Sequence, residues 1–72
     1  MNHAVVFEKS GTGYGAYVPD LPGCISVGDT REETERNIRE AIEGHVHVMR
    51  EHGEKVPKPT TIVKEIAIRI PA

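Results

Sequence analysis

The chain has 72 residues, enough for one small domain and too few for a second. It has one phenylalanine, two tyrosines and no tryptophan, so few large side chains can fill a core and association with another chain is expected. The formal net charge is -2, which excludes a bulk positive field for nucleic acid. The single cysteine, Cys24, excludes an intramolecular disulfide.

The start of the chain has a strand pattern rather than a charged leader, and no stretch reaches the roughly 20 apolar residues of a membrane span. We therefore expect a soluble cytoplasmic protein without membrane contact. Residues 1–72 are expected to form a single domain.

Three short apolar segments predict three β-strands, at residues 4–9, 15–18 and 24–27. Turn residues at 10–13 join the first two into a hairpin, because glycine supplies the backbone conformation of a tight reversal. Two prolines and a glycine make residues 19–23 a rigid corner. In the third segment Ile25 and Val27 are two residues apart, so we expect them to form its buried face.

A long helix is predicted after residue 30. Thr30 and Glu33 have the spacing of a capping box, which marks the start of a helix. Gly53 is placed as the glycine that follows a helix, and prolines at 57 and 59 prevent its continuation. A stripe at helical spacing is expected to face the sheet: Thr34, Ile38, Ala41, Ile42, His45 and Met49.

Residues 60–70 alternate again, with isoleucines at 62, 66, 68 and 70 on one side, and predict a fourth strand. The expected order is β-β-β-α-β. A meander followed by a helical crossover places the last strand beside the first, so we predict an α+β fold with a four-stranded mixed sheet, order 3-2-1-4, and one helix on one face. An isoleucine-rich edge strand invites pairing between chains. We therefore expect a dimer or a tetramer.

Patterns that could carry chemistry have simpler interpretations. Residues 11–16 fit a dinucleotide-binding glycine pattern, but they open a strand where that site requires a helix. His45 and His47 point to opposite sides of a helix and cannot share a metal ion. Cys24 is expected to be an inert buried residue. The sequence therefore predicts no catalytic residue, no metal site and no cofactor.

Charge is unevenly distributed along the chain. Residues 29–43 contain six acidic and three basic side chains, whereas residues 55–72 contain four basic and one acidic side chain. A negative helix followed by a positive segment suits docking to another protein. A solvated amphipathic helix explains the same distribution equally well.

A set of residues within about positions 14–60, most of the chain, closely resembles the HicB-like antitoxin family. The pattern combines a proline-glycine-cysteine corner, a capped helix and a proline exit in a fixed order. Its residues are Tyr17-Val18-Pro19-Asp20-Leu21-Pro22-Gly23-Cys24, Ser26, Gly28-Asp29-Thr30, Glu32-Glu33, Asn37, Ala41-Ile42, Gly53, Val56-Pro57 and Pro59.

The resemblance implies a partial ribonuclease-H-like fold and an antitoxin role. Members of the family bind a small HicA-type toxin, an mRNA-cleaving ribonuclease, and cover its active site. Many also carry a C-terminal DNA-binding segment. This sequence stops directly after its fourth predicted strand, so we expect no such segment and no direct DNA binding by this chain.

The leading hypothesis is a non-enzymatic antitoxin that binds and occludes a HicA-like toxin. Two alternatives stay open: an orphan oligomeric interaction module without a toxin partner, and a metal-dependent nuclease on a trimmed ribonuclease-H-like scaffold. The residues expected to contact a partner are mostly charged positions of the helix, together with one in the corner: Asp20, Glu32, Glu33, Arg36, Glu40 and Glu43.

Overall fold

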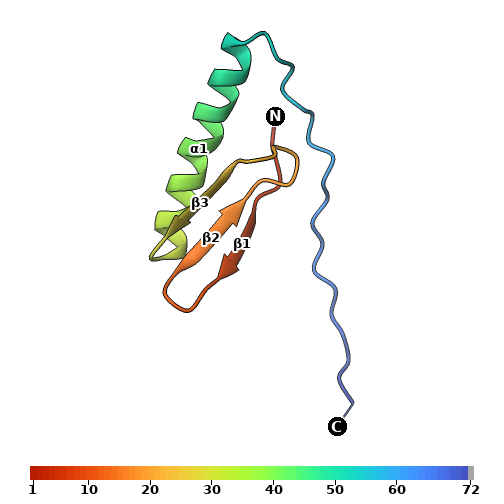
Figure 1. The fold of residues 1–72 in the computed structure, drawn as a ribbon. Helices are drawn as coiled ribbons and strands as arrows, with labels where there is room; N and C mark the ends of the chain where they lie inside the picture. The colour runs from red at the N-terminus through yellow and green to blue at the C-terminus, as the bar shows by residue number, and fades with distance from the viewer. Residues whose placement is uncertain (72) are drawn as a thin grey trace.

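Three strands and one helix make up the folded part of the chain. The structure is a computed structural model that describes residues 1–71. The chain order is β1 (Val6–Lys9), β2 (Tyr14–Tyr17), β3 (Ile25–Gly28) and α1 (Arg31–Glu51). The helix lies across one face of the sheet, chiefly over β3 and β2 (Figure 1). The three predicted strands and the predicted helix are therefore confirmed.

The sheet is antiparallel throughout, in the order β1-β2-β3. Phe7 lies opposite Ala16, and Ala16 lies opposite Ser26. Ala16 is buried and Phe7 packs against the core, so this row faces the helix. Successive side chains of a strand point to opposite faces, and the next row along therefore lies on the outer face: Val6, Tyr17 and Ile25.

The predicted buried face of β3 is wrong. Ile25 and Val27 are 69% and 72% exposed on the outer face. The helix instead packs against the other face, where a Cβ on Gly28 would lie 2.6 Å from Oγ1 of Thr34. Asn37 of the helix also donates a hydrogen bond of 2.8 Å to the Val27 carbonyl. Alternation defines two faces of a strand but does not decide which one meets the helix.

The core is small and lies between the helix and the sheet. Its buried hydrophobic residues come from β2, the residue that follows it, the corner and the helix: Ala16, Val18, Leu21, Cys24 and Ile38. Thr34 is fully buried, and its hydroxyl donates to the Thr30 carbonyl at 2.7 Å. The predicted inward stripe of the helix is confirmed, because Thr34 and Ile38 are buried and the other four members are half-buried.

Both ends of the helix carry the predicted caps. Oγ1 of Thr30 accepts a hydrogen bond of 3.1 Å from the Glu33 amide. At the other end Gly53 has a φ of 69°, and its amide donates to the Arg50 carbonyl at 3.1 Å. The Glu54 amide donates to the Met49 carbonyl at 2.8 Å, which completes a Schellman motif. The helix boundaries are thus fixed by local side-chain and glycine chemistry.

The predicted fourth strand is wrong, and with it the four-stranded sheet of order 3-2-1-4. The described chain has a three-stranded sheet, and residues 54–71, here called the tail, belong to no helix or strand. The tail runs clear of the sheet and continues past the β1–β2 turn (Figure 1). Alternating side chains favour an extended backbone, but a strand also needs a partner edge, which alternation does not specify.

Among residues 1–71, no helix has both the length and the apolar character that a bilayer span requires.

Candidate functional site

The corner, residues 19–24, is a rigid loop attached to the core. The Val18 amide donates to the Cys24 carbonyl at 3.1 Å, and the Cys24 amide donates to the Leu21 carbonyl at 3.0 Å. Leu21 is 1% exposed. Gly23 has a φ of 83°, a conformation that side chains with a Cβ rarely adopt. The corner therefore presents Pro22 and Gly23 in a fixed position at the surface.

Asp20 of the corner holds the base of the tail. Its Oδ2 accepts hydrogen bonds from the Thr60 and Thr61 amides, both at 2.9 Å. Its Oδ1 accepts from the two threonine hydroxyls at 3.0 and 2.9 Å. The backbone N–H groups of Thr61 and Thr60 lower the pKa of Asp20 to about 2, because they favour its charged form. This carboxylate is therefore an anchor between segments 40 residues apart.

A second contact fixes the tail nearer to the helix. The Nε2 atom of His3 lies 2.9 Å from the Pro57 carbonyl oxygen, within hydrogen-bonding distance. Sequence patterns did not predict either anchor, because each joins residues that are distant along the chain and carry no shared motif. The proline exit predicted for this segment is thus part of a surface attachment.

An apolar groove lies between the corner and the second half of α1. We call it the corner groove; its volume is about 690 Å³. Ile25 on one side is 69% exposed and Val48 on the other is 49% exposed. The imidazoles of His45 and His52 also line it. Exposed apolar side chains gathered beside polar groups are typical of a protein-binding surface. The sequence did not reveal this groove, because Ile25 was expected inside.

The charged residues predicted to contact a partner fall into separate groups. Asp20 lies in the corner and is bonded to the tail. Glu33 is half-buried in the first turn of the helix, near the β1–β2 turn. Successive spacings of four, four and three residues place the remaining four on one exposed helical stripe, here called the charged stripe: Glu32, Arg36, Glu40 and Glu43.

The residues considered for chemistry lie in the corner, on the helix and in the β1–β2 turn. Cys24 is buried, and burial raises the pKa of its thiol. His47 lies 3.0 Å from Glu51 in an exposed pair one helical turn apart. Over the described part of the chain, no three histidine, cysteine, aspartate or glutamate side chains gather as a metal-ion site would require. The glycine pattern at 11–16 forms the β1–β2 turn and the strand after it.

Comparison with known proteins identifies the family. The model for the HicB_like antitoxin of bacterial toxin-antitoxin systems matches residues 3–69. The chain belongs to the HicB-like antitoxin family. The three-stranded sheet, the capped helix and the proline-glycine corner all lie within the matched range.

Sequence relatives of this HicB-like chain have different lengths. A UPF0150 protein of Synechocystis is 43% identical over 70 residues, which cover 96% of this chain and 89% of that protein. An uncharacterized 14.9 kDa protein of Haemophilus phage HP1 is 42% identical over 92% of this chain and 50% of its own length. Antitoxin HicB 2 of Photorhabdus laumondii is 32% identical over 100% of this chain and 51% of its own. The chain spans about half the length of the last two.

Two solved structures share the fold of this HicB-like chain. One belongs to a HicA3 and HicB3 toxin-antitoxin complex, with a TM-score of 0.70, 27% identity and coverage of 83% of this chain and 70% of that chain. The other is the N-terminal domain of the Burkholderia pseudomallei antitoxin HicB, with a TM-score of 0.67 and 41% identity. That match covers 79% of this chain and 68% of the other.

Proposed function

We propose that this HicB-like chain is an antitoxin that binds a HicA-like toxin and blocks access to its active site. The observation that carries the proposal is the structural similarity to a chain of a HicA3 and HicB3 toxin-antitoxin complex. Membership of the HicB-like antitoxin family supports it independently. An mRNA-cleaving toxin acts in the cytoplasm, so the proposal places the antitoxin there.

The proposed contact surface combines the charged stripe with the corner groove. The stripe carries three carboxylates and one guanidinium in solvent, and acidic side chains suit a partner that binds RNA through positive charge. The corner groove adds exposed apolar area at Ile25 and Val48. Glu33 lies near the β1–β2 turn and Asp20 is bonded to the tail, and their direct contact with a partner stays a prediction.

Inhibition would occur by occlusion and not by a reaction of the antitoxin. Complementary charge speeds the encounter of two proteins, whereas buried apolar contacts slow their dissociation. In this protein the charged stripe would serve the first purpose and the corner groove the second. A bound antitoxin would then exclude RNA from the toxin without any catalytic residue of its own.

Self-association is part of the same proposal. Among residues 1–71, ten large hydrophobic side chains are exposed in the single chain, five of them in the tail. Such a surface favours burial against another protein surface. We infer a dimer or a tetramer.

Co-expression with a HicA-like toxin from a neighbouring gene tests the antitoxin role. The full chain should restore growth and co-purify with the toxin. The double variant E32K/E40K reverses two charges of the stripe, and its affinity should fall about tenfold or more, equivalent to about 1.4 kcal/mol. E8K makes the same kind of charge change on exposed β1 and should bind normally.

The contrary outcome is equally specific. A tagged chain that recovers no small basic protein from its native cells, and that fails to restore growth beside the toxin, contradicts the antitoxin role. An oligomeric module without a toxin partner would then remain as the explanation of the fold.

A further inference from the structure

The tail displays a row of isoleucines that the rest of the described chain leaves uncovered. Ile62, Ile66, Ile68 and Ile70 are 91%, 74%, 78% and 79% exposed. In an extended backbone residues two apart point to the same side, so these four share one side of the tail. Nine extended residues, 62–70, span about 30 Å. The isoleucine side chains therefore form a long apolar ridge along the tail, which is exposed to solvent in the single chain.

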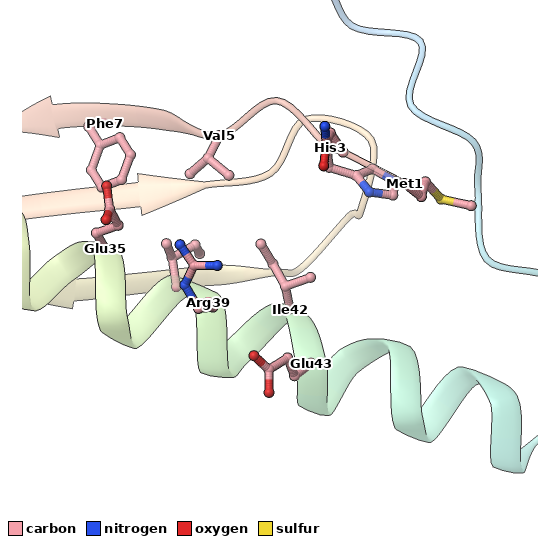
Figure 2. Close-up of a pocket in the computed structure, with 10 residues that line it drawn as sticks. Met1, His3, Val5, Phe7, Glu35, Arg39, Ile42 and Glu43 are labelled. Atoms are coloured by element: carbon pink, nitrogen blue, oxygen red, sulfur yellow. The ribbon is translucent and has the colours of Figure 1, made fainter.

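A groove of matching character lies on the β1 side of the body. We call it the β1 groove; its volume is about 370 Å³. Val5 and Phe7 line one wall and Ile42 of α1 faces them from the other (Figure 2), with Ile38 also lining the groove. Within residues 1–71, β1 pairs only with β2, so its other edge has free backbone donors and acceptors that can bind an extended chain.

Charge supports the same pairing. Glu35, Arg39 and Glu43 of α1 line the β1 groove, which gives its helical wall two negative charges and one positive (Figure 2). The isoleucine side of the tail contains one charge, Lys64, between Ile62 and Ile66. Opposite charges attract, so the acidic side chains of this wall suit a lysine on the docking side of the tail. The lysine that interrupts the apolar row is thus compatible with docking in this groove.

The two anchors direct the tail away from its own body. Asp20 holds Thr60 and Thr61, and His3 contacts Pro57. Beyond Thr61, the described residues 62–71 make no backbone–backbone hydrogen bond to the body. Its path runs clear of the sheet in Figure 1. The ridge is therefore available to another molecule, and a second copy of this chain supplies a β1 groove.

We propose that two chains exchange tails, so that the isoleucine row of each occupies the β1 groove of the other. A reciprocal exchange about a twofold axis buries both ridges and closes the assembly as a dimer. The proposal deepens the self-association inferred above and does not depend on a toxin. In this arrangement the tail of a chain does not become a fourth strand of that chain's own sheet.

Disulfide trapping distinguishes exchange between chains from return within one chain. The full-length variants V5C and I66C are purified separately, mixed and oxidised mildly. A second mixture combines V5C with I68C. Buried Cys24, at 3% exposure, does not compete. We expect a linked heterodimer in at least one mixture, because a disulfide requires Cα atoms within about 7 Å. A67C, on the opposite side of the tail, should link several-fold less.

The opposite result is a mixture with no linked heterodimer, while the double variants V5C/I66C or V5C/I68C form an internal disulfide in a monomer. That result overturns the exchange. Linkage of A67C as efficient as that of I66C and I68C also overturns it, because the isoleucine side would then not be the side that docks.

Light scattering without any toxin gives the second measurement. The full chain should be a dimer at micromolar concentration, and I66D/I68D should be a monomer whose circular dichroism still shows the helix. A67D should remain a dimer. A monomeric full chain, or an I66D/I68D variant that stays dimeric, contradicts the proposal. Loss of toxin binding with an intact dimer would instead contradict only the antitoxin role.

Discussion

The body of this protein, residues 6–53, and its tail, residues 54–71, were built from similar sequence patterns and behave differently. In the body the alternating strands pair, and the helical stripe covers a core. In the tail an equally regular alternation leaves every isoleucine exposed. The difference shows that a pattern specifies backbone conformation locally, whereas burial requires a surface that the same chain does not always supply.

The largest expected effect comes from shortening one isoleucine in each region. I38A removes buried methyl groups from the core and should lower the free energy of unfolding by about 2–5 kcal/mol. I66A removes the same atoms from the exposed tail, so its cost should grow with protein concentration as the proposed dimer forms. Urea unfolding at several concentrations measures both. A loss of stability in I66A that does not change with protein concentration would indicate that Ile66 packs against the body of its own chain.

Glycine substitutions test how tightly the body is packed. A Cβ on Gly28 would lie 2.8 Å from the Thr34 amide nitrogen, so G28A should cost about 1–3 kcal/mol. Gly44 lies in the helix with open space around it, and G44A should stabilise by about 0.5–1 kcal/mol. Thermal unfolding should shift in opposite directions. A G28A variant as stable as the parent protein would show that the helix and β3 can move apart at little cost.

Removing the helix cap gives an intermediate effect. T30A deletes the hydroxyl that accepts from the Glu33 amide and should lower stability by about 1 kcal/mol. T12A, in the exposed β1–β2 turn, should change it by less than about 0.5 kcal/mol. Chemical denaturation measures the pair. Indistinguishable variants would mean that the helix start depends on packing and not on its cap.

The smallest effect on overall stability is expected at the anchor of the tail. The pKa of Asp20 is lowered from 3.8 to about 2 by the Thr61 and Thr60 amides. A carboxyl group whose pKa is lowered in the folded protein stabilises the fold at pH values above its ordinary pKa. This stabilisation is lost as the pH falls from about 4 towards 2. The protection of the Thr60 and Thr61 amides against exchange, taken relative to an unstructured amide at the same pH, should therefore fall over that range.

At neutral pH, the D20N variant should lower the protection of the same two threonine amides against hydrogen exchange without unfolding the body. Nuclear magnetic resonance measures both. D29N changes an exposed carboxyl just before the helix and serves as the control. Unchanged protection of the two threonine amides in D20N would show that the tail is held by other contacts.

Much of the body could be predicted because its signals are local. Thr30 and Gly53 marked the two ends of the helix within a few residues of each end. The orientation of Ile25 and Val27 could not be predicted, since both faces of β3 alternate and only packing with the helix selects one. The partners of Asp20 could not be predicted for another reason. Nothing in the sequence around an aspartate indicates that it will bind threonines 40 residues away.

The candidate site was predicted in part for the same reasons. Helical periodicity placed the charged stripe correctly in solvent, because charged side chains repeat on one face. Whether those residues touch a partner stays a prediction. The corner groove was missed, because it forms only where the corner and the start of β3 come together with the second half of α1. Surfaces made from two distant segments leave no periodic signal in either.

The Asp20 anchor also makes the starting point of the outer tail independent of the length of the loop before it. Residues 54–59 run between two fixed points, the glycine turn that ends α1 and the carboxylate that holds Thr60 and Thr61. Insertions in such a surface segment cost little free energy. Related chains could therefore lengthen or shorten this connection while the residues beyond it still depart from the same place and in the same direction.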